Sequence, residues 1–268
     1  MNLQKALPAA LVSVLLFSAC KKDKDPVIVV PPSSGSTIEF NGLVGAEAGS
    51  SAGNAVYLDL STNTTIPVTR AAWDLAFYCG AEFRVLLNHT SSAGAKVLTQ
   101  NDLTAVGAAD TMGLTLAVNQ LAPSPADMAY FDDIAGSVTG TVIPEVSATD
   151  ANNKVIVINR GTGGGIQARP WMKIRVLRNG SNGYTLQYAG ITATTFQTLQ
   201  VSKDGNYHVK LVSFDNGVLA AGQPEKAKWD LVWSYSVYQT NFGGGPVPYN
   251  FSDLIAVNHW SDVQVKEK

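Results

Sequence analysis

The feature that most constrains the fold of this chain is an internal repeat, in which about residues 54–89 and 210–245 align without a gap. Each copy contains the tripeptide Trp-Asp-Leu, at residues 73–75 and 229–231, so the offset is 156 residues. After each tryptophan, large apolar side chains alternate with other residues, which is the period of a β-strand with one face on the core. Solenoid repeats recur about every 20 to 50 residues, and the longer offset therefore predicts two related sub-sheets within one domain.

The two Trp-Asp pairs allow a structural and a ligand-binding interpretation. Burial of an aromatic side chain of this size removes roughly 150 to 250 Å² of its surface from water. Trp73 and Trp229 are therefore predicted to anchor the core at equivalent places, with Asp74 and Asp230 as structural neighbours. In the alternative interpretation, each pair stacks on a ligand or forms hydrogen bonds with it.

The rest of the chain predicts an all-β fold. Runs rich in β-branched and aromatic residues are separated by Asn-Gly and Asp-Gly turns, a pattern typical of antiparallel hairpins. Residues 171–178 and 183–189 are predicted to form one hairpin, and residues 194–201 and 207–214 another. We therefore expect a single antiparallel β domain that contains the two related Trp-Asp-Leu sub-sheets.

One short helix is expected between the two copies of the repeat. Ser124 is a typical N-cap residue, Pro125 suits the first helical position, and Asp127 lies three residues after the cap. The helix is predicted to run to about Asp133. The repeat symmetry is broken in this segment, so it is a reasonable place to search for a ligand site.

The N-terminus has the features of a bacterial secretion signal over residues 1–19. Lys5 supplies the positive start, and the apolar run at residues 9–17 is too short to span a bilayer. The small residues before Cys20 resemble a lipobox, which predicts that this cysteine is lipidated. The alternative is an ordinary signal peptide with a chance cysteine.

The segment that follows the cysteine predicts a tether. Residues 20–36 are charged and rich in proline and serine, a composition that cannot bury a core, and the folded domain is expected over residues 37–268. Asp23 and Asp25 resemble the surface-export signal of Bacteroidetes lipoproteins, whereas the neighbouring lysines would attract anionic headgroups, and the sequence leaves both interpretations open. The expected location is the outer membrane, with a lipid anchor, at the cell surface.

Charge and motif content exclude several classes of function. The formal net charge of −2 at pH 7 argues against nucleic acid as a partner. The sequence has the histidines His89, His208 and His259 but no HExxH, GxSxG or paired-cysteine motif, so neither an enzyme nor a metal centre is expected. His208 alternates with apolar neighbours and is expected to point to solvent. The glycine-rich run at residues 161–165 lacks the Lys-Ser/Thr of a phosphate-binding loop and is interpreted as a flexible loop.

Several segments of the chain together resemble a known family. They are AWDLAF at 72–77, FRVLLN at 83–88, WMKIRVL at 171–177, KWDLVW at 228–233 and YNFSD at 249–253, ahead of Asn258. These segments resemble the HmuY family of Bacteroidetes haem-binding lipoproteins. The resemblance implies an all-β fold of the HmuY type and a haem clamped between two axial side chains from the region between the repeat copies. It also implies an outer-membrane uptake receptor as a candidate partner.

The chain departs from the family pattern at the expected haem ligands. No histidine lies between His89 and His208, which excludes a pair of histidines from that region. Because thioether sulfur also ligates haem iron, Met128 is a candidate ligand, with Met112 or Met172 as its partner. The alternative is that all three methionines fill gaps in the core.

Two arginines complete the expected haem site, since Arg160 or Arg169 could pair with a propionate. The sequence thus predicts a non-enzymatic surface lipoprotein that captures haem or a similar flat apolar ligand. The competing hypothesis is a surface lipoprotein of the same fold that has lost haem binding and interacts with proteins or glycans.

Overall fold

A computed structural model describes residues 35, 37–44, 52–133 and 136–265. The chain divides into two compact units, Met1–Thr37 and Ile38–Lys268, and the sheets and turns below belong to the second unit. The predicted signal peptide, Cys20 and nearly all of the predicted tether lie outside the described residues.

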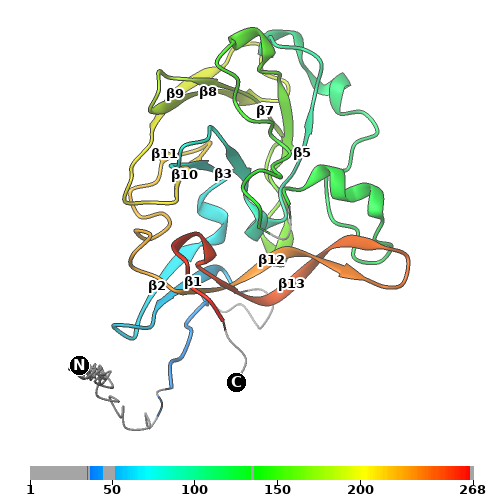
Figure 1. The fold of residues 1–268 in the computed structure, drawn as a ribbon. Helices are drawn as coiled ribbons and strands as arrows, with labels where there is room; N and C mark the ends of the chain where they lie inside the picture. The colour runs from blue at the N-terminus through cyan, green and yellow to red at the C-terminus, as the bar shows by residue number, and fades with distance from the viewer. Residues whose placement is uncertain (1–34, 36, 45–51, 134–135, 266–268) are drawn as a thin grey trace, which may run out of the picture. The chain divides into compact units, whose positions relative to one another are not determined.

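Three antiparallel sheets make up the described part of the second unit, which confirms the predicted all-β fold (Figure 1). The first sheet has the order β13-β12-β1-β2, with β1 at Asn54–Asp59, β2 at Thr64–Thr69, β12 at Leu231–Asn241 and β13 at Pro246–Val257. The second has the order β11-β10-β3-β4, with β3 at Leu75–Tyr78, β4 at Val85–Leu87, β10 at Val209–Ser213 and β11 at Gly217–Val218. The third has the order β5-β6-β7-β8-β9, with strands at Gly94–Val97, Ile156–Asn159, Met172–Arg178, Gly183–Gly190 and Gln197–Ser202.

The helical segments among the described residues are short 3₁₀ turns. They are η2 Arg70–Ala72, η3 His89–Ser91, η4 Leu103–Ala105, η5 Ala108–Thr111, η6 Pro125–Tyr130, η7 Asp150–Asn152, η8 Gly163–Gly165 and η9 His259–Ser261. The predicted short helix is η6, where the Ser124 hydroxyl accepts the Ala126 N–H at 3.2 Å. It ends at Tyr130, earlier than expected, because the backbone of Phe131 is already extended.

One predicted hairpin is confirmed and the other is wrong. β7 and β8 pair around the Asn-Gly turn, where Gly180 takes a φ of +61°. β9 and β10, by contrast, belong to different sheets: β9 pairs with β8, and β10 pairs with β3 and β11. The reason lies in the connection, because the Lys203 ammonium donates to the Gly80 and Glu82 carbonyls and so takes the chain over to the second sheet.

The second sheet lies between the other two (Figure 1). Leu75 and Phe77 of β3 pack in the large core shared with the third sheet, while Ala76 packs with Trp73 in a smaller core toward the first sheet. The sequence pattern predicted a strand with one buried face, but β3 is buried on both faces because a sheet covers each side.

The two copies of the repeat exchange strands. β1 of the first copy pairs with β12 of the second, and β10 of the second copy pairs with β3 of the first. The Asp230 N–H donates to the Leu58 carbonyl at 2.7 Å, and the Asp74 N–H donates to the Val212 carbonyl at 2.8 Å. Leu58 and Val212 are therefore structurally equivalent. The alignment predicted from the sequence had no gap and paired Leu58 with Phe214, so a two-residue gap must be placed between these strands and the tryptophan.

Candidate functional site

The same Asn-His turn ends the first copy of the repeat, at residues 88–89, and follows the second copy, at residues 258–259. After β4, the Asn88 side-chain amide donates to the Arg70 carbonyl at 2.8 Å and to the Trp73 carbonyl at 2.7 Å. After β13, the Asn258 amide donates at 2.9 Å to the carbonyls of Lys226 and Trp229, which are the repeat partners of Arg70 and Trp73. His89 and His259, the residues that follow these asparagines, therefore occupy equivalent positions.

The backbone of the two turns supports this equivalence. Both turns end in a left-handed residue, Ser92 with a φ of 58° and Asp262 with a φ of 61°. In each, the N–H of that residue donates to the carbonyl of the histidine. The sequence carries the signal as Asn-His-x-Ser at residues 88–91 and 258–261. The two motifs are farther apart than the two tryptophans because the β12–β13 hairpin is longer than the β3–β4 hairpin, so the motif does not follow the 156-residue offset of the repeat.

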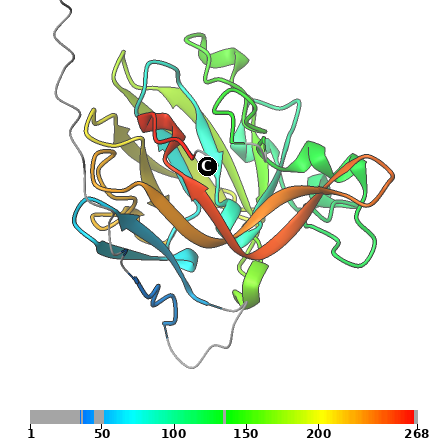
Figure 2. The ribbon, with the colours of Figure 1, turned by 60° about the horizontal axis from the view of Figure 1, so that its bottom comes forward.

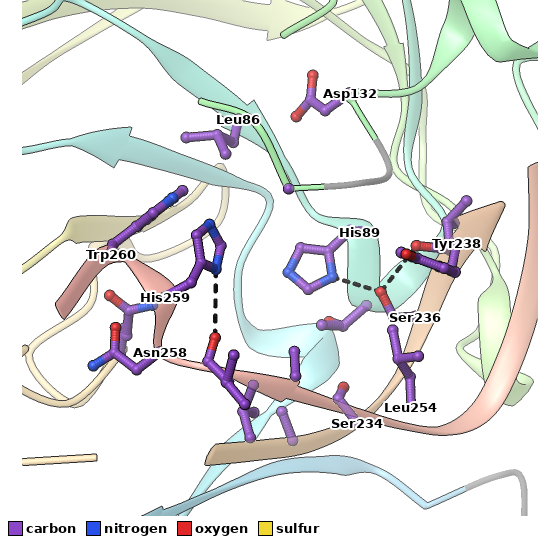
Figure 3. Close-up of a pocket in the computed structure, with 18 of the residues that line it drawn as sticks. Leu86, His89, Asp132, Ser234, Ser236, Tyr238, Leu254, Asn258, His259 and Trp260 are labelled. Carbon is purple, nitrogen blue, oxygen red and sulfur yellow. Dashed lines mark hydrogen bonds between the residues drawn. The ribbon is translucent and has the colours of Figure 1, made fainter. Parts of the chain in front are cut away.

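The two turns place both histidines on one cavity of about 550 Å³. Its walls come from β4, β12, β13 and the segment around Asp132 (Figure 3). Most of the lining side chains are apolar or aromatic, among them Tyr57, Leu86, Phe131, Trp229, Leu254 and Trp260. Cavities of this size and character are typical of small-molecule sites.

The hydrogen bonds around His89 favour one tautomer of its ring. Its Nδ1 lies 2.8 Å from the Ser236 hydroxyl oxygen, and that hydroxyl donates its hydrogen to the Val237 carbonyl at 3.2 Å. The hydroxyl therefore accepts the Nδ1–H of His89, which leaves a lone pair on Nε2. Figure 3 shows the His89 ring within the cavity, so this lone pair is available to a ligand.

His89 is an exposed residue whose ring lies on the cavity wall. The exposed part of the ring faces the cavity and protein surrounds the rest, so desolvation lowers the pKa of His89 to about 4. At neutral pH the imidazole is uncharged and suited to bind iron or accept a hydrogen bond. His259 reaches the same cavity from η9, with its Nδ1 3.4 Å from the Val257 carbonyl oxygen.

Asp132 is a carboxyl group on the cavity wall. One of its oxygens accepts the Leu87 N–H at 2.6 Å and the other accepts the Val142 N–H at 2.8 Å, so it joins its own segment to β4. Burial raises the pKa of Asp132 to about 6, although both N–H bonds lower it.

Comparison with known proteins decides the family. A family model described as HmuY protein matches residues 51–238, well over half of the chain. The chain belongs to the HmuY family. At the family level, this membership points to a non-enzymatic haem-binding protein of the cell surface. No curated protein and no solved structure matched the chain. The HmuY match ends within β12, so β13 and His259 lie beyond it.

The HmuY resemblance suggested methionine ligands, and the structure places the three methionines in different surroundings. Met172 packs in the large core, Met112 is 81% exposed beyond η5, and Met128 is half-buried in η6. None of them lines the cavity of the two histidines. The two histidines lie outside the region predicted to supply the haem ligands: His89 precedes it in the sequence and His259 follows it.

The two arginines expected to pair with a propionate form an internal ion-pair network. Arg160 binds the Asp74 carboxylate at 2.8 and 2.9 Å and Asp215 at 2.6 Å. Arg169 binds Asp74 at 3.0 Å and the Arg160 carbonyl at 2.7 Å. Neither arginine lines the cavity, and both are engaged by protein groups. Asp74 has a structural place in this network.

The two tryptophans of the repeat are both buried, but their surroundings differ. Trp73 is 5% exposed and packs in the smaller core, with its ring 6.0 Å from that of His89. Trp229 is 8% exposed and lines the cavity, and its Nε1–H has no hydrogen-bond partner among the described residues. Asp230 accepts the Leu60 N–H at 2.7 Å.

The prediction that His208 points to solvent is wrong. Its side chain is 7% exposed, and its ring lies 6.3 Å from that of Trp229 and 5.5 Å from that of Trp260. Its Nε2 lies 2.8 Å from the Ser261 hydroxyl. The reason is that the second Asn-His turn covers this side of the sheet, a contact that strand periodicity does not reveal. No helix in the described ranges has the length and apolar character needed to cross a membrane.

Proposed function

We propose that the chain is a lipid-anchored cell-surface protein of the outer membrane that binds haem, or a similar flat apolar ligand, in the cavity between its two Asn-His turns. It captures this ligand without catalysing a reaction and passes it to an uptake receptor. The observation that carries the proposal is the position of the His89 ring, which contacts Ser236 through Nδ1 and lies on an apolar cavity shared with His259.

The donor set of the cavity suits haem. Imidazole nitrogen is a common axial ligand of haem iron, so His89 and His259 would hold the metal. The hydrogen bond between His89 Nδ1 and the Ser236 hydroxyl orients the His89 ring, as outer-shell partners of metal ligands commonly do. Bound haem would supply an iron centre, and side chains such as Leu86, Trp229 and Leu254 would pack against its apolar faces.

A second candidate function is interaction with a protein or glycan, and one surface feature favours it. The β12–β13 hairpin projects from the sheets (Figure 2) and carries an exposed aromatic residue near its tip, Phe242, at 66% exposure. The Phe242 ring lies 5.5 Å from Tyr249, which lies 5.5 Å from Phe251. Tyr249 and Phe251 are partly exposed, and aromatic residues are enriched at protein interfaces.

A haemin titration tests the proposed function. We expect the purified full-length chain to give a saturable Soret change at one haem per chain. Replacement of His89 by Ala is expected to weaken binding at least about tenfold, because losing even a residue that supports a metal ligand costs about that much affinity. The Met128→Ala variant is the matched control and should bind like the wild type. The absence of a saturable change would reject haem and favour the interaction hypothesis.

The lipid anchor is tested separately. Cys20 follows the apolar stretch of the predicted signal peptide, and the multiply acylated cysteine of a lipoprotein anchors stably where one acyl chain does not. The Cys20→Ala variant, expressed in the native host, is expected to leave the membrane fraction. A variant that fractionates with the membrane like the wild type would show that the anchor lies elsewhere.

A further inference from the structure

The charged groups around the histidine cavity have one sign. Asp132 and Asp133 line the cavity, whereas no lysine or arginine of the described ranges 37–44, 52–133 and 136–265 does. Haem carries two propionates, and a carboxylate that leaves water without a cation or a set of hydrogen-bond donors is strongly destabilised. The Trp229 Nε1–H offers a neutral donor there, but no cation of the described ranges accompanies it, so the cavity suits the iron and the apolar faces of haem better than its carboxylates.

The buried arginines close to the site are committed to other groups. Arg70 is fully buried beneath the first Asn-His turn, where its guanidinium donates to the carbonyls of Ala52, Thr90, Gly163 and Gly164. Arg160 and Arg169 are held by Asp74, and Arg160 also by Asp215. To bind a propionate, any of these guanidinium groups would have to give up bonds that stabilise the fold.

The Asp132 carboxyl on the cavity wall is bound by the N–H groups of Leu87 and Val142 and forms no ion pair with a cation of the described residues. A nearby cation lowers the pKa of a carboxyl group. Burial raises the pKa of Asp132, and only the N–H groups of Leu87 and Val142 act in the opposite direction. At neutral pH its negative charge would repel a second carboxylate placed in the cavity.

We infer that this cavity accepts the uncharged part of its ligand and excludes carboxylates, so that its ligand class is a flat apolar molecule whose acidic groups stay outside. The inference rests on the proposed function. A haem would enter with its propionates directed to solvent, and a porphyrin without carboxylates would bind at least as tightly. The site thus selects ligands by charge as well as by the affinity of imidazole for iron.

The test compares haemin with its dimethyl ester, which lacks the two carboxylates, in titrations of the full-length chain at pH 7.5 and one detergent concentration. We expect the ester to bind with a Kd equal to or lower than that of haemin. A Kd for haemin about tenfold lower than that of the ester would overturn the inference and leave haem binding intact. Failure of both ligands to bind would reject the proposed function together with the inference.

A variant that adds a positive charge to the cavity wall tests the inference in a second way. Ser137 is an exposed residue on the cavity wall, and Ser181 is an exposed residue in the β7–β8 turn, away from the cavity. Ser137→Lys is expected to lower the Kd of haemin relative to that of the ester by about three- to tenfold, because it supplies a cation that only the carboxylates of haemin can pair with. Ser181→Lys changes the net charge equally and should alter neither affinity. Equal effects of both variants on haemin would show that net charge, not the cavity, governs the selection.

Discussion

Replacing Asp74 by Ala is expected to lower the free energy of unfolding by about 3 to 5 kcal/mol, the usual cost of leaving one member of a buried ion pair without its partner. Asp74 is 2% exposed, and its carboxylate binds Arg160 and Arg169 and accepts the Phe214 N–H at 2.9 Å. In the variant, Arg160, which is 4% exposed, would keep an ion pair only with the exposed Asp215. Urea denaturation of the wild type and the variant measures the difference.

The internal repeat supplies a matched control. Asp230 is the equivalent residue of the second copy, where it accepts the Leu60 N–H, and no arginine of the described residues pairs with it. Asp230→Ala is therefore expected to cost about 1 kcal/mol, the contribution of an ordinary hydrogen bond. If the Asp74 variant loses no more stability than the Asp230 variant, the buried network does not stabilise the fold as described.

Trp73→Ala is expected to cost about 3 to 5 kcal/mol, the range for emptying a large aromatic site. The indole packs with Val68, Val209 and Leu211 between the first and second sheets. Trp229→Ala is expected near the lower end of this range, because one side of Trp229 already borders the cavity. If both variants keep the wild-type denaturation midpoint and lose ligand binding, the tryptophans stack on a ligand and do not anchor the core.

The sequence was sufficient for the local parts of this fold. The Asn-Gly turn specified the β7–β8 hairpin, because a tight turn and two alternating strands define their own register. The pairing of β1 with β12 and of β10 with β3 could not be predicted in this way, since it joins segments of distant sequence. Hydrophobic alternation shows which face of a strand is buried, but it does not identify the neighbouring strand.

The candidate site was harder to predict than the fold. The methionines and arginines were chosen because the family resemblance pointed to the region between the copies. The structure brings together His89 and His259, each preceded by an asparagine that binds carbonyls of its own tryptophan segment, while haem binding by the methionines or arginines stays a prediction. The repeated Asn-His-x-Ser motif contained this information, but the longer second hairpin moved it out of register with the tryptophan repeat.

The most direct test of the histidine cavity is the optical spectrum of ferric haemin bound to four forms of the full-length chain: the wild type, His89→Ala, His259→Ala and the double variant. With both imidazoles as axial ligands, the wild type should give a six-coordinate low-spin spectrum. Each single variant should lose the low-spin bands, and the double variant should show no saturable binding. A low-spin spectrum that persists unchanged in the double variant would contradict the assignment and place the haem ligands outside this cavity.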